Sequence, residues 1–251
     1  MVSPLGARRK TRASNFVRGY ARLLVVVGAG LLAVACTQTK AFLSETEIPE
    51  RSGTLRVLLM PPDVEVSEIT AAGLPEPKAD WTASAKQNVE TALDAILAER
   101  DARLIRYRSA SGDSAIDEAH LQAVKLHGAV GNTILRHKYL PNMALPTKKD
   151  KFDWSLGEGV TVLRDSFGAD YALFVYFRDS FASSGRVAVI FIGALFGVGI
   201  PGGQQVGFAS LVDLRSGDVV WFNRLLKGTG DLRKPDLARS ASEELLSELP
   251  L

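Results

Sequence analysis

The sequence predicts an α/β sandwich: a single domain with a mixed sheet, made of two helix-strand units, then a β-meander and a C-terminal helix. Two segments, at 80–97 and 116–137, carry apolar residues at helical spacing, and each has a short β-rich run beside it. From residue 170 the period changes, and four β-rich segments precede a last amphipathic segment. This order of elements is typical of a sheet covered by helices.

The first unit begins with Leu55–Met60, a nearly continuous apolar run closed by Pro61-Pro62. Such a run is typical of a buried strand that ends where proline cannot donate to a sheet. After a loop that reaches Asp80, apolar residues share one face of an expected helix: Ala85, Val89, Leu93, Ile96 and Leu97.

The second unit is expected to contain a strand at 104–107 and a helix at 116–137. Gly128 and Gly131 weaken that helix by about 1 kcal/mol each relative to alanine. A short helix at 153–167 is expected to complete this half of the domain.

The second half is predicted to be a meander followed by a helix. Tyr171–Phe177 is rich in β-branched and aromatic residues, which favour a strand. Three more strands are expected at 187–192, 205–214 and 219–225, with a hairpin loop at 213–218. The closing helix is expected at 235–247, where a proline is tolerated in the first turn.

The first 35 residues have the composition of a secretory signal peptide. They carry six bases and no acid, and Leu23–Ala35 then runs for 13 residues without a charge. A membrane-spanning helix needs roughly 20 apolar residues, so this stretch is too short for a retained anchor. It ends in Ala33-Val34-Ala35-Cys36, which resembles the lipobox of bacterial lipoproteins. The resemblance implies cleavage before Cys36 and attachment of acyl chains, palmitate among them, to its sulfur.

Three segments are therefore expected: a signal peptide at 1–35, a lipidated N-terminus with a flexible tether at 36–53, and the α/β domain at 54–251. Several acyl chains on one cysteine hold a protein stably on a bilayer, whereas a single chain binds only marginally. Lipoproteins kept on the inner membrane carry aspartate after the cysteine, and this chain has Thr37. The resemblance thus implies the periplasmic face of the outer membrane.

The positive charge of the chain belongs to the leader. Loss of its six bases changes the formal net charge from +2 to −4. No excess of bases then remains to form the basic face that nucleic-acid binding requires, so nucleic acid is excluded as a partner. Cys36 is the only cysteine, and lipidation leaves it no thiol to oxidise in the envelope.

Three stretches carry a family resemblance. They are the strand that ends in Leu59-Met60-Pro61-Pro62, the Gly168-Ala169-Asp170-Tyr171 entry to a strand, and the hairpin from Leu211 to Trp221. In these the chain resembles a group of periplasmic and outer-membrane lipoproteins related to the curli-secretion channel lipoprotein and to the amino-terminal domain of TolB. The resemblance implies the fold and membrane association, and it brings no catalytic residues.

The run from Val187 to Ile200 holds 14 residues without one polar side chain. Two interpretations stay open: a buried strand with its turn, or an exposed apolar loop that enters the bilayer interface or docks on a partner. The run does not alternate apolar and polar residues, which argues against a pore-forming hairpin. For the second interpretation the candidate contact residues are Val189, Phe191, Leu195, Phe196, Val198 and Ile200.

Other motifs give no chemistry. Gly197-Val198-Gly199-Ile200-Pro201-Gly202 has the spacing of a dinucleotide-binding turn but leads into a predicted strand rather than a helix, so no cofactor is expected. His120, His127 and His137 are separated by about 10 and 15 Å along a helix, too far to share one metal ion. No Gly-x-Ser-x-Gly nucleophile elbow is present, so no catalytic residues are assigned.

These observations together predict a non-enzymatic, lipid-anchored envelope protein that binds other envelope proteins and that could form homo-oligomers. Two alternatives remain open: a subunit or accessory of an oligomeric export channel, and a hydrolase of cell-wall or lipid material. The hydrolase would need a polar cleft with a histidine or carboxylate of shifted pKa, for which His127 and Asp170 are the candidates.

Overall fold

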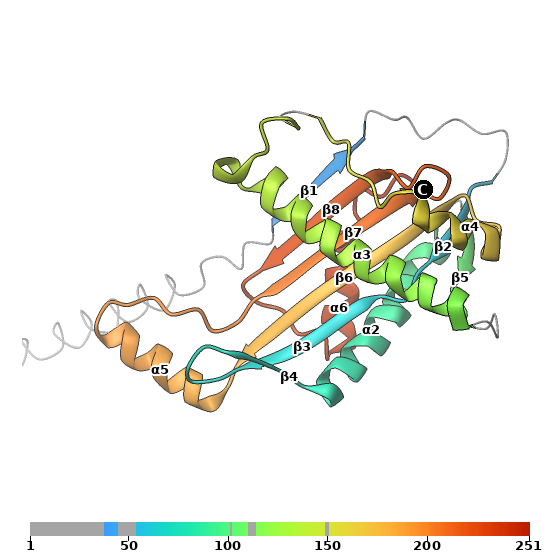
Figure 1. Cartoon of the computed structure of the whole chain (residues 1–251). Coiled ribbons are helices and arrows are strands. Elements are labelled where there is room, and N and C mark those ends of the chain that lie inside the picture. Colours follow the sequence, from blue (N-terminus) through green and yellow to red (C-terminus); the bar gives the residue numbers. More distant parts are fainter. Residues whose placement is uncertain (1–37, 45–53, 101, 110–113, 149–150) are drawn as a thin grey trace, which may run out of the picture. The chain divides into compact units, whose positions relative to one another are not determined.

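Eight strands form one open mixed sheet with helices on both faces, as the computed structural model shows (Figure 1). The structure describes residues 38–44, 54–100, 102–109, 114–148 and 151–251. The predicted signal peptide at 1–35 and the predicted lipidation site Cys36 lie outside these residues. The predicted α/β sandwich with a mixed sheet is confirmed.

The main path of the sheet runs β1-β8-β7-β6-β2-β5. In chain order these strands are β1 (Gln38–Leu43), β2 (Arg56–Leu59), β5 (Arg103–Arg106), β6 (Tyr171–Ala182), β7 (Gln205–Asp213) and β8 (Val219–Lys227). β1, β8, β7 and β6 pair antiparallel, whereas β2 lies parallel to both β6 and β5. β3 (Asp63–Ile69) continues alongside β6 beyond β2, and β4 (Pro75–Pro77) pairs with β3.

The 12-residue strand β6 lies at the centre, and its first seven residues, Tyr171–Phe177, are apolar on both faces. Tyr171, Leu173, Val175 and Phe177 pack on one side, against α2 (Ala79–Ala98) and α6 (Pro235–Leu245). Ala172 and Phe174 pack on the other, toward α3 (Ser114–Tyr139) and α4 (Thr161–Phe167). A strand buried on both faces explains why the sequence is continuously apolar there.

One predicted strand is wrong. Val187–Ile192 belongs to helix α5 (Ser184–Leu195), which lies beyond the end of β6 and in neither helical layer (Figure 1). Ser183 N still donates to Ile69 O at 3.0 Å, but beyond this point no described strand runs alongside the chain. A helix satisfies its own backbone groups without a neighbouring strand, and this requirement overrides the β-propensity of the valines and isoleucines.

Three further segments differ from expectation. Gln38–Leu43, assigned above to the tether, forms β1 because β8 supplies a pairing edge from Trp221 to Leu226. The loop expected before Asp80 contains β3 and β4, and β3 is held by seven register positions along β6. Of the helix expected at 153–167, only Thr161–Phe167 is α-helical, since Ser155 bridges to Asp218 beside the sheet.

Candidate membrane and partner contact site

Helix α5 projects from the sheet, and little of the described part of the chain packs over it. The Ser183 hydroxyl caps its start by accepting a hydrogen bond from Arg186 N at 3.1 Å. None of its residues is buried, and Phe191 and Leu195 have exposed fractions of 66% and 69%. Phe196, just after the helix, is 80% exposed. The interpretation of this run as buried core is therefore wrong.

The return loop after α5 packs on the helix and keeps it in place. The Arg186 guanidinium donates to Pro201 O from Nε at 3.3 Å and from Nη2 at 3.2 Å. Ile200 lies so close to Gly193 that a Cβ there would be 2.7 Å from Ile200 Cδ1. Of the candidate contact residues, Val189 and Ile200 are half-buried, and the other four are exposed.

The turn between β3 and β4 adds to the same surface, which the sequence analysis missed. A Cβ on Gly185 would be 3.2 Å from Ala71 Cβ, so the turn touches the start of α5. Leu74 in this turn is exposed. We call α5, the loop 196–201 and the turn 70–74 together the apolar projection. The signal that could have found Leu74 is the uncharged stretch Thr70–Leu74.

The apolar projection carries almost no charge. Between residues 183 and 205 the only ionised side chain is Arg186, and residues 70–74 have none. No carboxylate would therefore need to be desolvated if this surface were covered. An exposed apolar surface of this kind marks contact with a membrane or with another protein.

Strand register places the start of β1 at the same end of the sheet as α5. Gln38 pairs with Leu226 of β8, and Leu226 pairs with Val206 of β7. Gln205, next to Val206, pairs with Asp179, three residues before β6 ends and the chain enters α5.

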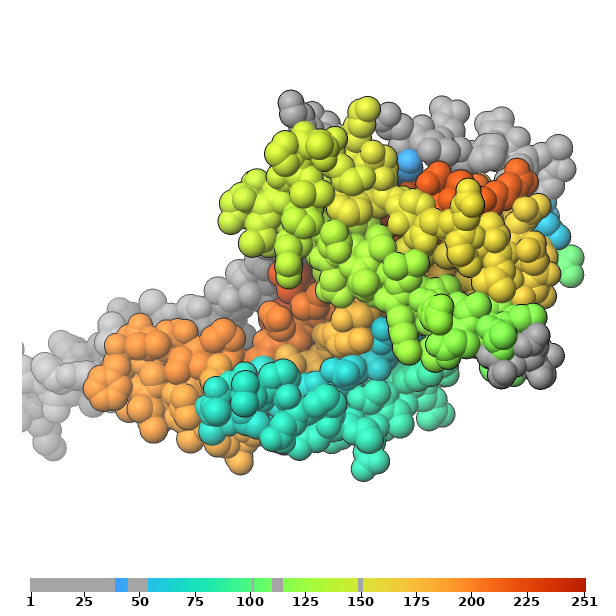
Figure 2. Space-filling view, viewed as in Figure 1, coloured from blue at the N-terminus to red at the C-terminus, as the bar shows by residue number. Residues whose placement is uncertain are grey.

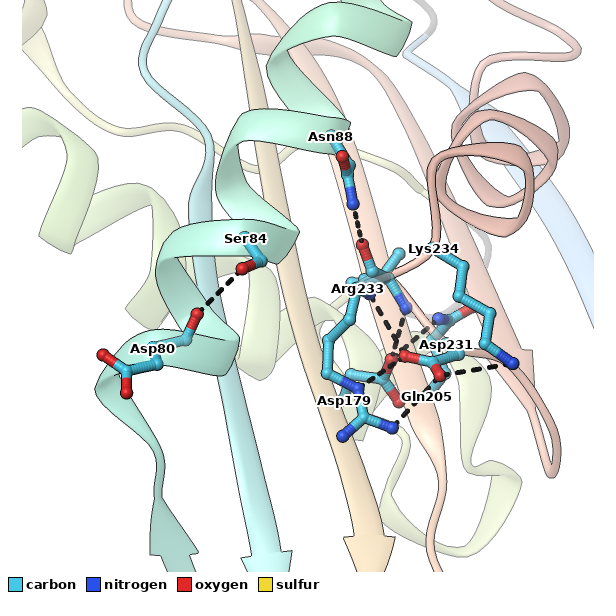
Figure 3. A network of polar contacts seen from close by, with 9 residues as sticks. Asp80, Ser84, Asn88, Asp179, Gln205, Asp231, Arg233 and Lys234 are labelled. Carbon is cyan, nitrogen blue, oxygen red and sulfur yellow. Dashed lines mark hydrogen bonds and ion pairs between the residues drawn. The ribbon is translucent and has the colours of Figure 1, made fainter.

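A polar network joins α2, β6, β7 and the 231–234 loop (Figure 3). Buried Asp179 accepts hydrogen bonds at Oδ2 from Leu232 N at 3.0 Å and from Gln205 Nε2 at 3.3 Å. Burial raises the pKa of Asp179. In the adjacent loop Asp231 is held by Arg233, with Nε 2.7 Å from Oδ1. Partial burial acts to raise the pKa of Asp231, but the hydrogen bonds and charge of Arg233 outweigh it and lower this pKa.

The network links three elements rather than forming a reaction centre. The Arg233 guanidinium lies over Trp81 of α2 and over Phe181 of β6, with Cζ 4.4 and 4.0 Å from the two ring centroids. Asn88 of α2 donates to Leu232 O at 3.0 Å. The geometry therefore ties the 231–234 loop to α2 and to the end of β6, the strand that leads into α5.

The three histidines lie apart and each has its own partner. His120 Nε2 is 3.1 Å from Ser166 Oγ, and His127 Nε2 is 2.9 Å from Ser210 Oγ. His137 Nδ1 is 2.7 Å from Met143 O. Burial lowers the pKa of His127 to about 3, and its ring stacks on Phe174. This shift comes with enclosure in the core rather than with a polar cleft, so it does not support the hydrolase.

Two further findings concern the described part of the chain alone. It holds no group of three or more His, Cys, Asp or Glu side chains arranged to bind a metal ion. None of its helices is both long and apolar enough to cross a membrane. Residues 197–202, with dinucleotide-type spacing, lie in the loop that leads from α5 into β7, and no helix follows them.

No protein-family model and no curated protein matches the chain. Among solved structures it is similar to the PelC dodecamer from Paraburkholderia phytofirmans, at 12% identity and a TM-score of 0.35, with 84% of this chain and 96% of that chain covered. A variant of that dodecamer matches at 14% identity and a TM-score of 0.37, with the same coverage. Neither comes from the curli-related group that the sequence resembles, and similarity at this level carries no conclusion about function.

Proposed function

We propose that this protein is a non-enzymatic envelope component, anchored by lipid on Cys36 at the periplasmic face of the outer membrane, where it binds other envelope proteins. The apolar projection is its second contact with the bilayer. The observation that carries the proposal is the exposed, charge-poor helix α5 at the sheet end where β1 begins.

The arrangement suits a surface that meets one bilayer at two points. Lipid on Cys36 would bring Gln38, and with it this end of the sheet, close to the membrane. α5 then presents Phe191, Leu195 and Phe196 at the same end. Full burial of a leucine or phenylalanine side chain contributes about 1.5–3 kcal/mol, so these three side chains add an appreciable second contact to the lipid.

The partner-binding role rests on what the rest of the domain offers. With one end of the sheet on the bilayer, the opposite end, with the 213–218 hairpin loop between β7 and β8, faces away from the membrane. Segment 154–157 covers part of this loop, and its exposed residues Arg215 and Ser216 would meet soluble regions of envelope proteins. The buried histidine and the buried Asp179 network serve packing, which fits a binding component better than a hydrolase.

Vesicle sedimentation of the chain from residue 37 onward, which lacks both the leader and the cysteine, tests the membrane contact. We expect Phe191→Ser with Phe196→Ser to weaken vesicle binding at least about tenfold, since two apolar side chains lose their burial. Leu121→Ser with Leu126→Ser is the matched control, because these α3 leucines are also exposed but lie outside the projection. Equal binding by all three proteins would contradict the proposal.

Native mass of the lipidated protein in mild detergent separates this proposal from the export-channel alternative. A monomer or small oligomer that retains one reproducible envelope protein supports the binding component. A closed ring of this chain alone would instead favour the channel subunit.

A further inference from the structure

Cationic side chains from three elements gather at the C-terminal end of α3. We call them the basic cluster: Lys40 of β1, Arg136 and Lys138 of α3, and Arg224 of β8. The ammonium groups of Lys40 and Lys138 each lie 5.1 Å from the centroid of the Phe42 ring. The Arg224 guanidinium lies over the Tyr139 ring, with Cζ 4.2 Å from its centroid. The centroids of these two rings are 5.1 Å apart, so the cations surround one aromatic pair.

Three members of the cluster have no carboxylate partner in the described part of the chain. Lys40 and Arg224 are paired directly across β1 and β8, where like charges are destabilising. No described carboxylate forms an ion pair with either of them or with Arg136. Burial raises the pKa of Tyr139, the charge of Arg224 acts against this rise, and the charge of Glu248 adds to it. One carboxylate is thus near the cluster, but it pairs with none of the three cations.

Helix stability does not account for the whole cluster. The last turn of α3 is basic, and the helix dipole favours cations there. Lys40 and Arg224, however, come from strands. Their contacts with aromatic rings hold the two side chains in place but leave both charges in full. An anion shared by these cations would remove the repulsion between them.

The basic cluster lies at the end of the sheet from which α5 projects. Arg136 and Arg224 line an apolar groove. Val206 and Leu226 form its other wall, and strand register places both at this end of the sheet. In Figure 2 the surface is hollowed between the C-terminal part of α3 and α5, where β7 and β8 come to the surface. Leu140 also lines the groove and is 46% exposed, so apolar surface borders the cations.

We propose that the basic cluster binds the phosphates of anionic phospholipid headgroups in the bilayer that the apolar projection enters. The inference rests on the membrane contact that is part of the proposed function. Apolar side chains at one point and cations at another match the interior and the headgroup layer of an anionic bilayer. Lys40 and Arg136 are exposed and contact the phosphates, whereas half-buried Arg224 adds its positive charge without direct contact.

The net charge of the chain makes the proposal specific. After loss of the six leader bases the formal net charge is −4, so an anionic bilayer repels the chain as a whole. Stronger binding to anionic than to neutral vesicles therefore requires a local group of cations that faces the surface. Each lysine or arginine near an anionic bilayer surface contributes about fivefold to the affinity.

Vesicle sedimentation of the chain from residue 37 onward tests the proposal. It compares vesicles of phosphatidylcholine with vesicles that also contain phosphatidylglycerol, and we expect stronger binding to the second kind. Lys40→Gln with Arg136→Gln should lower the affinity for the anionic vesicles at least about tenfold and leave the affinity for the neutral vesicles unchanged. Lys125→Gln with Arg215→Gln is the matched control, because it removes one lysine and one arginine from exposed positions outside the cluster.

The outcomes separate this inference from the function on which it rests. Equal losses in the cluster variant and the control variant would overturn the proposal, because overall charge would then decide the binding. Equal binding of the parent chain to both kinds of vesicle would also overturn it and leave the membrane contact of the apolar projection standing. Binding to neither kind would refute that membrane contact and, with it, the role of the cluster.

Discussion

Two glycines on one helix should respond oppositely to the same substitution. Gly128 and Gly131 both lie in α3, and alanine is better than glycine by about 1 kcal/mol within a helix. A Cβ on Gly128 would be 3.6 Å from Tyr176 Cε2, which is ordinary contact. A Cβ on Gly131 would be 2.0 Å from Phe208 Cε2 and 2.5 Å from Cζ.

The Phe208 ring cannot move away from that clash. It is fully buried and stacked between Tyr176, at 4.3 Å between ring centroids, and Phe222, at 5.6 Å. Gly131→Ala must therefore displace α3 from the sheet, and overpacking of this kind costs about 1–3 kcal/mol. Gly128→Ala should raise the free energy of unfolding by up to about 1 kcal/mol.

Urea unfolding at 25 °C, followed by circular dichroism, measures both effects. With an unchanged m-value, the midpoint should rise for Gly128→Ala and fall for Gly131→Ala relative to the parent chain. Similar shifts of both variants in one direction would refute the packing of α3 on Phe208, because helix propensity alone would then decide both outcomes.

Three further predictions concern polar side chains. Burial lowers the pKa of His127 to about 3, so the unfolded chain binds a proton below pH 6.5 that the folded chain does not. Between pH 7.5 and 5, the free energy of unfolding should therefore fall by about 2 kcal/mol more in the parent chain than in His127→Gln. Urea unfolding measures both proteins, and an identical pH dependence would contradict this prediction. Asp179→Ala leaves Leu232 N and Gln205 without their acceptor, so the free energy of unfolding should fall by about 1–3 kcal/mol. Asp179→Asn keeps an acceptor oxygen and avoids a buried charge, so its loss should be smaller. Equal losses of the two variants in urea unfolding would count against the network. Tyr139→Phe removes the hydrogen bond from Tyr139 Oη to Lys40 O, and amide hydrogen exchange should become faster in β1 but not in β3.

Periodicity in the sequence was enough to predict the elements that pack on both sides of the sheet. The face of α2 that carries Ala85, Val89 and Leu93 is buried as expected, and Tyr171–Phe177 lies in the central strand. These elements follow their local pattern because the spacing of the apolar residues matches the positions that are buried on folding.

Local pattern failed where pairing partners lie far away in the sequence. Gln38–Leu43 and Asp63–Ile69 are polar enough to resemble loops, yet β8 and β6 pair with them from far along the chain. Val64 and Val66 do alternate with acidic residues as in a strand, but local sequence does not say which distant segment pairs with them. The polar network of Asp179 and Arg233 could not be predicted from the sequence either, because only the fold brings the end of β6 and the 231–234 loop together.

For the candidate contact surface too, the sequence determined one part of the answer and the tertiary structure the other. The sequence by itself determined that Val187–Ile200 is apolar and uncharged, which left a core strand and an exposed contact as alternatives. The tertiary structure decided between them. These residues follow the end of β6, where the described part of the chain offers no further strand or covering helix. The backbone therefore forms a helix, which pairs its own polar groups, and the apolar side chains of that helix stay exposed.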